Sequence, residues 1–393
     1  MRPAADGSHA VVANGCRRAA QRYARPAPAA EVHVAGAPTT LEDGIAAAAR
    51  LLKRARQPLI SGLATDVDGT RAAVNLAERC RAVLDHAHGD TLARVARLTQ
   101  TRGWYATTLS EVRSRADFVL LVDTELGDRY ESFARRCLGP RAGLNDDTPR
   151  TVGFIGPAGR LPRDAALDLR LACRSERVAE ALLALLAELR GNPLAATRPA
   201  GLARRSLTEL AERLRAARYA TIVVTPAALG AACEPVLGAV CDIVDELNRD
   251  GRAAVLPLGG DDGAQSAVST CTWLTGFPLR IGFGEVISYE PQAYAGTALL
   301  ASGAADALVW IDAFGNCPEP PPGCPADRTI VLGATPSNLA GTCAVHITVG
   351  TPGIDHFARL VRTDAVVTLA LPQQRDSGLP SIAGVLTRIA EKL

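Results

Sequence analysis

The stretch TLSEVRSRADFVLLVDTE, residues 108–125, has a counterpart later in the chain, TALLASGAADALVWIDAF, residues 297–314. Each stretch places a helix-like segment before the pair Ala-Asp, then a run of apolar residues, then an aspartate. A short continuous apolar run between polar residues is typical of a strand that is buried on both faces. Both stretches therefore predict a helix that leads into an internal strand of a parallel sheet.

The surrounding sequence repeats the order helix, strand, turn, helix, strand in both halves, which indicates an α/β fold. We expect two related doubly wound, mostly parallel α/β domains, because the segment GNPLAATRPAG between the two halves has the composition of a linker. The predicted division is a small N-terminal piece at 1–40, a first domain at 41–195, a second domain at 196–345, and a C-terminal segment at 346–393 that packs back on the core.

The overall charge argues against a nucleic-acid partner. The 43 basic and 41 acidic residues give a formal net charge of +2, which produces no strong electrostatic field. All basic residues except Lys53 and Lys392 are arginines, and with so much alanine this pattern indicates a coding bias. No dense arginine cluster is interleaved with aromatic residues, as a nucleic-acid surface would require.

The sequence also predicts a cytoplasmic protein without a membrane segment. It has no apolar run of about 18 residues, and its N-terminus lacks the apolar core of a secretory signal. None of the ten cysteines forms a C-x-x-C pair, so we expect them to be buried small hydrophobic residues in a reducing compartment. A metal cluster assembled from distant cysteines stays open as an alternative.

The densest group of candidate site residues is DHAHGD, residues 85–90. In an extended chain, His86 and His88 point to the same side, and the end of a parallel strand is where α/β sheets bind ligands. Two histidines are one ligand short of the three that a catalytic zinc usually takes from protein. Metal binding and a loop without a direct role both stay open for this stretch. We expect His346, in the alternating stretch CAVHITV, to be a satisfied core or edge histidine.

Several longer segments resemble the B subunit of formylmethanofuran dehydrogenase, a member of the molybdopterin oxidoreductase superfamily. The resemblance is stronger to the corresponding subunit of the formyltransferase/hydrolase complex of methylotrophic bacteria. It covers most of residues 45–393, and its most specific motif is TWLTGFP. The matching segments are ISGLATDVDGTRAAVNLAERCRAVLD, TLSEVRSRADFVLLVD, STCTWLTGFPLRIGFGEVISYEPQAYAG and FARLVRTDAVVTLAL.

The chain departs from the dehydrogenase pattern in three places. The resemblance implies a four-cysteine segment for a [4Fe–4S] cluster, of which only Cys16 remains. It places Ala87 where the family has a cysteine or selenocysteine that ligates tungsten or molybdenum, and His88 at the family histidine that follows. An arginine expected near the active centre is replaced within FGEVISYEP.

The resemblance therefore implies a non-catalytic structural subunit with no cofactor or metal of its own, in which His88 is at most a vestigial site residue. The complex would move a formyl group from formyl-tetrahydromethanopterin to a methanofuran-like carrier and hydrolyse it to formate. The implied partners are a metal-dependent amidohydrolase-like subunit, a formyltransferase subunit and a β-helical subunit. Two alternatives stay open: an active dehydrogenase-type subunit that binds a pterin–metal cofactor, and a free-standing α/β binding protein.

Overall fold

The chain folds into two compact α/β units, as the sequence predicts. The computed structural model describes residues 2–3, 8–13, 15–124, 126–127, 130–139, 149–160, 166–192, 194–316, 319–333 and 343–393. The first unit contains residues 1–13, 20–93 and 260–393, and the second contains residues 14–19 and 94–259. Apart from the short segment 14–19, the chain passes from the first unit to the second within one helix and returns between Gly259 and Gly260.

The first unit is built on a long sheet with a parallel centre and antiparallel edges. The central strands β6, β5, β14, β15 and β16 are parallel, whereas β12, β13, β3 and β4 continue the sheet at its two edges in antiparallel pairs. In spatial order the strands are β13 (Ile287–Tyr289), β12 (Ile281–Phe283), β6 (Val83–Leu84), β5 (Pro58–Ala64), β14 (Ala307–Asp312), β15 (Thr329–Gly333), β16 (Val345–Thr348), β3 (Val32–Val34) and β4 (Ala37–Pro38).

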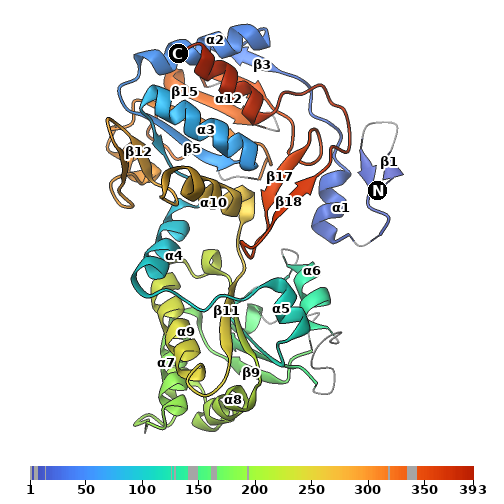
Figure 1. The fold of residues 1–393 in the computed structure, drawn as a ribbon, viewed down its shortest axis with the longest axis vertical. Helices are drawn as coiled ribbons and strands as arrows, with labels where there is room; N and C mark the ends of the chain where they lie inside the picture. The colour runs from blue at the N-terminus through green and yellow to red at the C-terminus, as the bar shows by residue number, and fades with distance from the viewer. Residues whose placement is uncertain are drawn as a thin grey trace. The chain divides into compact units, whose positions relative to one another are not determined.

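Helices cover both faces of this sheet. One face packs against α2 (Leu41–Arg54), α3 (Val67–Cys80), α10 (Ala264–Thr275) and α12 (Ile382–Glu391), and Figure 1 shows α3 and α12 side by side over it. The opposite face packs against α11 (Gly296–Ala301). The Thr40 side chain caps α2 by accepting a hydrogen bond from Asp43 N–H, and acidic residues fill the first turn.

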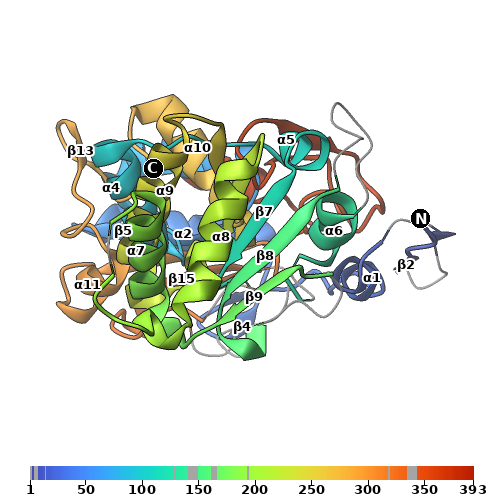
Figure 2. The same ribbon diagram turned by 90° about the horizontal axis from the view of Figure 1, so that it is seen from below.

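The second unit has a fully parallel sheet between two layers of helices. Figure 2 shows α7, α8 and α9 on one side of β7, β8 and β9, with α5 and α6 on the other side. In spatial order the strands are β11 (Ala253–Pro257), β10 (Ala220–Val224), β7 (Phe118–Val122), β8 (Thr151–Gly156) and β9 (Leu169–Ala172). The helices are α4 (Gly89–Arg102), α5 (Leu109–Ser114), α6 (Glu131–Phe133), α7 (Val178–Leu189), α8 (Arg204–Ala216) and α9 (Cys233–Leu247).

The two units do not follow one another along the chain, and this differs from the predicted division at residues 195 and 196. The predicted first domain, 41–195, contains β5 and β6 of the first unit together with β7, β8 and β9 of the second. The cause is long-range pairing, because β14 joins the first sheet beside β5, with Leu308 opposite Leu59. Local apolar patterns mark each strand but do not show which strands pair.

Three smaller elements lie outside the two large sheets and the helices that cover them. They are the strand pair β1 (Arg2–Pro3) and β2 (His9–Ala10), the helix α1 (Arg17–Tyr23), and the two-stranded ribbon of β17 (Ala358–Val361) and β18 (Thr368–Leu371). Within the described ranges, every helix is too short or too polar to cross a lipid bilayer.

Candidate functional site

The stretch 85–88 continues the line of β6 beyond its last strand residue. Asp85 N–H donates to the Ile60 carbonyl over 3.0 Å, and Ala87 N–H donates to the Gly62 carbonyl over 3.1 Å. These bonds hold the stretch beside β5 until α4 begins at Gly89. The histidines therefore lie at the carboxyl end of a parallel strand, as predicted, and their ring centroids are 5.5 Å apart.

His86 is buried, and both of its ring nitrogens are engaged. Its Nδ1 accepts a hydrogen bond from His88 N–H over 3.0 Å, so its proton is on Nε2, which lies 3.3 Å from the Asp262 carbonyl oxygen. Burial is the main cause that lowers the pKa of His86 to about 3, and the neighbouring His88 lowers it further. His86 is therefore a neutral structural imidazole at physiological pH.

His88 makes the other contact with the same aspartate. Its Nε2 lies 2.8 Å from Asp262 Oδ2, with the His88 side chain 28% exposed and the Asp262 side chain 8% exposed. Asp262 belongs to a short 3-10 turn, Asp261–Gly263, in which its own φ is +51° and that of Gly263 is +74°. This left-handed backbone presents both the carbonyl and the carboxylate of Asp262 to the two histidines.

Ala87 lies between these histidines but faces a different environment. Its side chain packs against the apolar cluster on the α11 face of the first sheet, whose buried members include Leu59, Trp310 and Val331. A methyl group offers no donor atom, and the cluster against which it packs consists of apolar and aromatic residues, with Cys324 and Cys343 among them.

Asp85, the first residue of the stretch 85–88, belongs to a network of ionic and hydrogen-bonded groups around Arg280. Asp85 Oδ2 accepts a hydrogen bond from Gly296 N–H over 2.7 Å, and Arg280 Nε lies 3.4 Å from Asp85 Oδ1. Arg280 also donates to Asp90 and, over 2.6 Å, to the Pro291 carbonyl. Burial raises the pKa of Asp85, and the Arg280 charge opposes this rise.

Close packing around Asp85 explains the glycine that starts α4. A Cβ atom on Gly89 would lie 2.2 Å from Asp85 Oδ1, which is far inside contact distance. Any larger residue at position 89 would push the carboxylate away from Arg280.

Sequence reasoning missed two of the residues that form this site. Asp262 follows β11 in the stretch PLGGDDGAQS, residues 257–266, and Arg280 follows the motif TWLTGFP by two positions. Asp262 is 174 residues from His88, and Arg280 is 195 residues from Asp85. The only signal for Asp262 was an acidic pair between glycines after a strand. The predicted arginine loss concerned FGEVISYEP, residues 283–291, which contain the last residue of β12, the turn after it, β13 and two residues beyond it.

The other candidate residues do not join this site. Cys16 lies at the start of α1, where its Sγ accepts a hydrogen bond from Ala19 N–H over 3.4 Å. Among the described residues, no group of three histidine, cysteine or acidic side chains is arranged to hold a metal ion. Cys317 lies outside the described residues.

His346 differs from its prediction as a satisfied histidine. It is fully buried in β16, opposite His33 of β3, and neither of its ring nitrogens has a hydrogen-bond partner. The sequence pattern gave its position in a strand correctly. It could not show that the side chains opposite it on β3 and β15, His33 and Val331, form no hydrogen bond with its ring.

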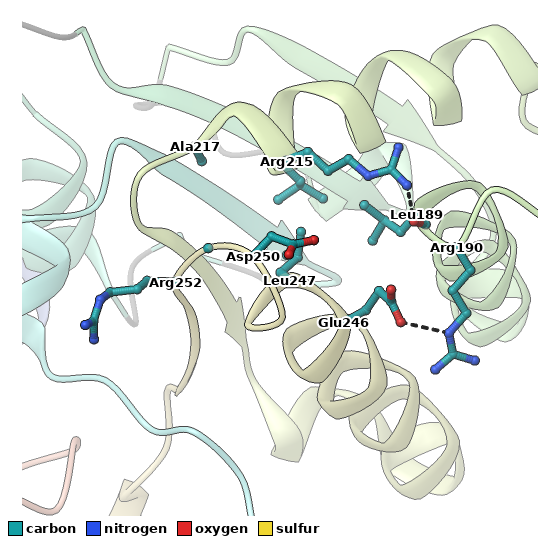
Figure 3. Close-up of a pocket in the computed structure, with 10 residues that line it drawn as sticks. Leu189, Arg190, Arg215, Ala217, Glu246, Leu247, Asp250 and Arg252 are labelled. Carbon is teal, nitrogen blue, oxygen red and sulfur yellow. Dashed lines mark hydrogen bonds and ion pairs between the residues drawn. The ribbon is translucent and has the colours of Figure 1, made fainter.

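A separate cavity of about 260 Å³ in the second unit is lined by charged residues (Figure 3). It lies where α7, α8 and α9 end, beside the residues that precede β10 and β11. Arg215 donates to the Leu189 carbonyl at the end of α7, and Arg190 Nε pairs with Glu246 Oε2 over 3.1 Å. These arginines cap helix carboxyl ends, and the cavity is at the amino edge of the sheet, opposite to the edge where such sheets bind ligands.

The side chains available at the end of β6, and Cys16, do not fit the pterin–metal group or the iron–sulfur cluster that the family resemblance implies. A soft metal prefers a thiolate ligand, and position 87 offers only a methyl group that packs against a hydrophobic cluster. The two nitrogens of His86 are engaged by His88 N–H and by Asp262, and the carboxylate of Asp262 binds His88. A cubane cluster needs about four thiolates, and Cys16 alone matches its segment.

An α/β chain with these two units and this order of motifs is similar to the B subunits of formylmethanofuran dehydrogenases and of a formyltransferase/hydrolase complex. It is 27% identical over 285 residues to the B subunit of tungsten-containing formylmethanofuran dehydrogenase 2 from Methanocaldococcus jannaschii, covering 68% of this chain and 63% of that protein. The match to the B subunit of the Methylorubrum extorquens formyltransferase/hydrolase complex is more extensive. It has 29% identity over 369 residues, covering 92% of this chain and 97% of that protein.

A solved structure agrees with the sequence comparison. A chain in the crystal structure of the Methylorubrum extorquens formyltransferase/hydrolase complex with methylofuran superimposes with a TM-score of 0.78. The two chains are 27% identical, and the match covers 92% of this chain and 98% of that one. No protein-family model matches the chain. The resemblance and the α/β fold predicted from the sequence are therefore confirmed.

Proposed function

We propose that this chain is a structural subunit, without a redox centre of its own, of a formyltransferase/hydrolase complex. In such a complex the partner subunits transfer a formyl group from formyl-tetrahydromethanopterin to a methanofuran-like carrier and hydrolyse it to formate. The partners we propose are a metal-dependent amidohydrolase-like subunit, a formyltransferase subunit and a β-helical subunit. Similarity over nearly the full length of the Methylorubrum extorquens homologue supports this assignment.

The observation that carries the proposal is the chemistry at the end of β6. Ala87 stands where the resemblance places a metal ligand, and its methyl group packs into an apolar cluster. The neighbouring His86 and His88 both bind Asp262, so the polar groups of the site satisfy one another. Side chains whose hydrogen bonds are made to one another in this way stabilise the fold and are not arranged to hold a soft metal.

An active dehydrogenase-type subunit is the alternative that the resemblance leaves open. It requires a thiolate ligand near position 87 and three further cluster thiolates in addition to Cys16. The described cysteines do not supply them: Cys80, Cys271 and Cys343 pack in or against the apolar clusters of the first unit. The structural role therefore agrees better with the donor set.

Metal analysis of the intact complex tests the absence of a redox centre. We expect tungsten, molybdenum and iron each to be far below one atom per copy of this chain. One atom of tungsten or molybdenum per copy, retained after extensive dialysis, would contradict the proposal. Zinc is not informative in this test, because the proposed amidohydrolase-like partner has a metal of its own.

A His88→Ala substitution tests the catalytic silence of this chain directly. We expect formyl transfer and hydrolysis by the assembled complex to change by less than about twofold, because a general acid or base contributes about 100-fold or more. His356→Ala is the matched control, since His356 is a partly buried histidine of the same unit that contacts the Phe357 carbonyl. A loss of about 100-fold in His88→Ala alone, with assembly intact, would overturn the assignment.

A further inference from the structure

The ribbon formed by β17 and β18 lies outside the long sheet of the first unit. Within the described part of the chain, these two strands pair with each other and with no further strand. An isolated two-stranded ribbon is marginally stable in water, so its stability depends on contacts along its two outer edges. Figure 1 shows the ribbon in red, with β17 and β18 labelled.

The outer edge of β17 is already occupied. Arg359 N–H donates to Asp66 Oδ2 over 3.4 Å, and Val361 N–H donates to Ser266 Oγ over 3.0 Å. Asp66 caps α3 and Ser266 belongs to α10, so side chains of two helices replace a neighbouring strand along this edge.

The outer edge of β18 has no such support. Arg362 N–H donates to the Val367 carbonyl, so by the alternation of an antiparallel ladder Leu369 and Leu371 make the next bonds to β17. The N–H and C=O groups of Thr368 and Ala370 therefore point away from β17. No hydrogen bond joins their N–H groups to any residue that the structure describes.

The side chains along this edge of β18 are uncharged, and several of them are apolar and exposed. Residues 365–371, AVVTLAL, contain no charge, no proline and no glycine. Val366 is 55% exposed, Val367 38% and Leu369 40%. Soluble proteins usually protect a free edge with a charge, a proline or a bulge, because an uncharged apolar edge pairs with other chains. This edge has none of these protections within the segment.

We propose that the free edge of β18 receives an extended strand of another subunit of the same complex. The strand adds to the ribbon through the N–H and C=O groups of Thr368 and Ala370, and its apolar side chains cover Val366, Val367 and Leu369. A strand fits better than a helix or a small molecule, because open backbone groups and uncovered side chains lie along one line. The inference rests on the proposed function, since a structural subunit must present a surface to its partners.

Proline substitution tests the edge selectively. Thr368→Pro removes an N–H that points away from β17, so it leaves the ladder inside the ribbon intact. Thr368→Val is the matched control, because it keeps the N–H and the shape of the side chain. Each variant, with an affinity tag, is co-expressed with the other subunits of the complex, and the recovered subunits are quantified.

We expect Thr368→Pro to recover at least about tenfold less of the partner subunits than the wild type, and Thr368→Val to recover as much as the wild type. The circular dichroism spectrum and the Tm of the isolated Thr368→Pro chain should match those of the wild type.

Full recovery of the partner subunits with folded Thr368→Pro would overturn the proposed strand pairing alone. If the wild-type chain recovers none of the other subunits, the proposed function is overturned, and with it the pairing. A dimer of the isolated wild-type chain that Thr368→Pro abolishes would show that a second copy covers the edge, which would also overturn the inference.

Discussion

The Ala87 methyl group lies between a hydrophobic environment and a polar one at the end of β6. Ala87 packs against a hydrophobic cluster, whereas its neighbours His86 and His88 both contact Asp262. Because Asp262 uses its carbonyl for one ring and its carboxylate for the other, the turn and the strand end stabilise each other. Hydrogen bonds within the chain therefore hold this strand end and the turn in place.

The buried neutral state of His86 gives a pH dependence of stability. Its pKa of about 3 in the folded chain is below the usual value near 6.5, so the unfolded chain binds its proton first as the pH falls. Stability from this group is complete above about pH 6.5 and is lost between about pH 6.5 and 3. We expect the difference in free energy of unfolding between the wild type and His86→Gln to shrink by about 2 kcal/mol from pH 7 to pH 5.

Urea denaturation of both proteins at the two pH values measures this difference. Comparing the two proteins at the same pH cancels the titration of all groups that they share. A difference that stays constant between pH 7 and 5 would mean that His86 is not buried as a neutral group.

The sequence alone predicted one half of this site. His86, His88 and the missing donor at Ala87 are neighbours in the chain, so their pattern could be recognised together. Asp262 and Arg280 could not be assigned, because their partners lie 174 and 195 residues away. Nothing in a local pattern shows which distant turn reaches a given strand end.

At the scale of elements, Arg280 links several segments that start or end near Asp85. It joins the residue before β12 to the end of β6 through Asp85, to α4 through Asp90, and to the segment before α11 through the Pro291 carbonyl. The Arg280 side chain is 8% exposed and that of Asp85 is 4% exposed. Removing one member of such a buried pair leaves the other charge without compensation.

We therefore expect Arg280→Met to lower the free energy of unfolding by about 3–5 kcal/mol. The double variant Asp85→Asn, Arg280→Met should cost less than the sum of the two single changes, by at least about 1 kcal/mol. Arg359→Met is the control, because its ion pair with Asp68 is solvent-exposed and should contribute less than about 1 kcal/mol. Strictly additive effects in this double-mutant cycle would show that Arg280 and Asp85 do not stabilise each other.

The elements themselves were more predictable than their contacts. The apolar run Phe118–Val122 forms β7, and Thr40 caps α2, because both depend on residues close in the sequence. β6 is shorter than its apolar pattern, with its ladder limited to Val83 and Leu84, although backbone bonds to β5 continue through Ala87. The unsatisfied nitrogens of His346 depend on its neighbours across the sheet, which no local pattern contains.

At the scale of the whole molecule, the second unit is a nearly continuous insertion into the first. Residues 94–259 contain all strands of the second sheet, and their two apolar clusters cover both of its faces. The first sheet, by contrast, needs residues from both sides of this insertion, because β14 pairs with β5. The repeated helix–strand pattern indicated two α/β units but carried no information about this interruption.

This arrangement predicts which fragments of the chain fold alone. A fragment of residues 94–259 should unfold cooperatively on heating and give a dispersed proton NMR spectrum, because it keeps its sheet and both of its apolar clusters. The fragment 41–195, the first domain of the sequential division, should be insoluble or lack a cooperative transition. It would expose the β7 edge that normally pairs with β10, and it would separate β5 from β14, so apolar strands of both sheets would lie open to water. Cooperative unfolding of 41–195 together with the failure of 94–259 would instead favour two successive domains.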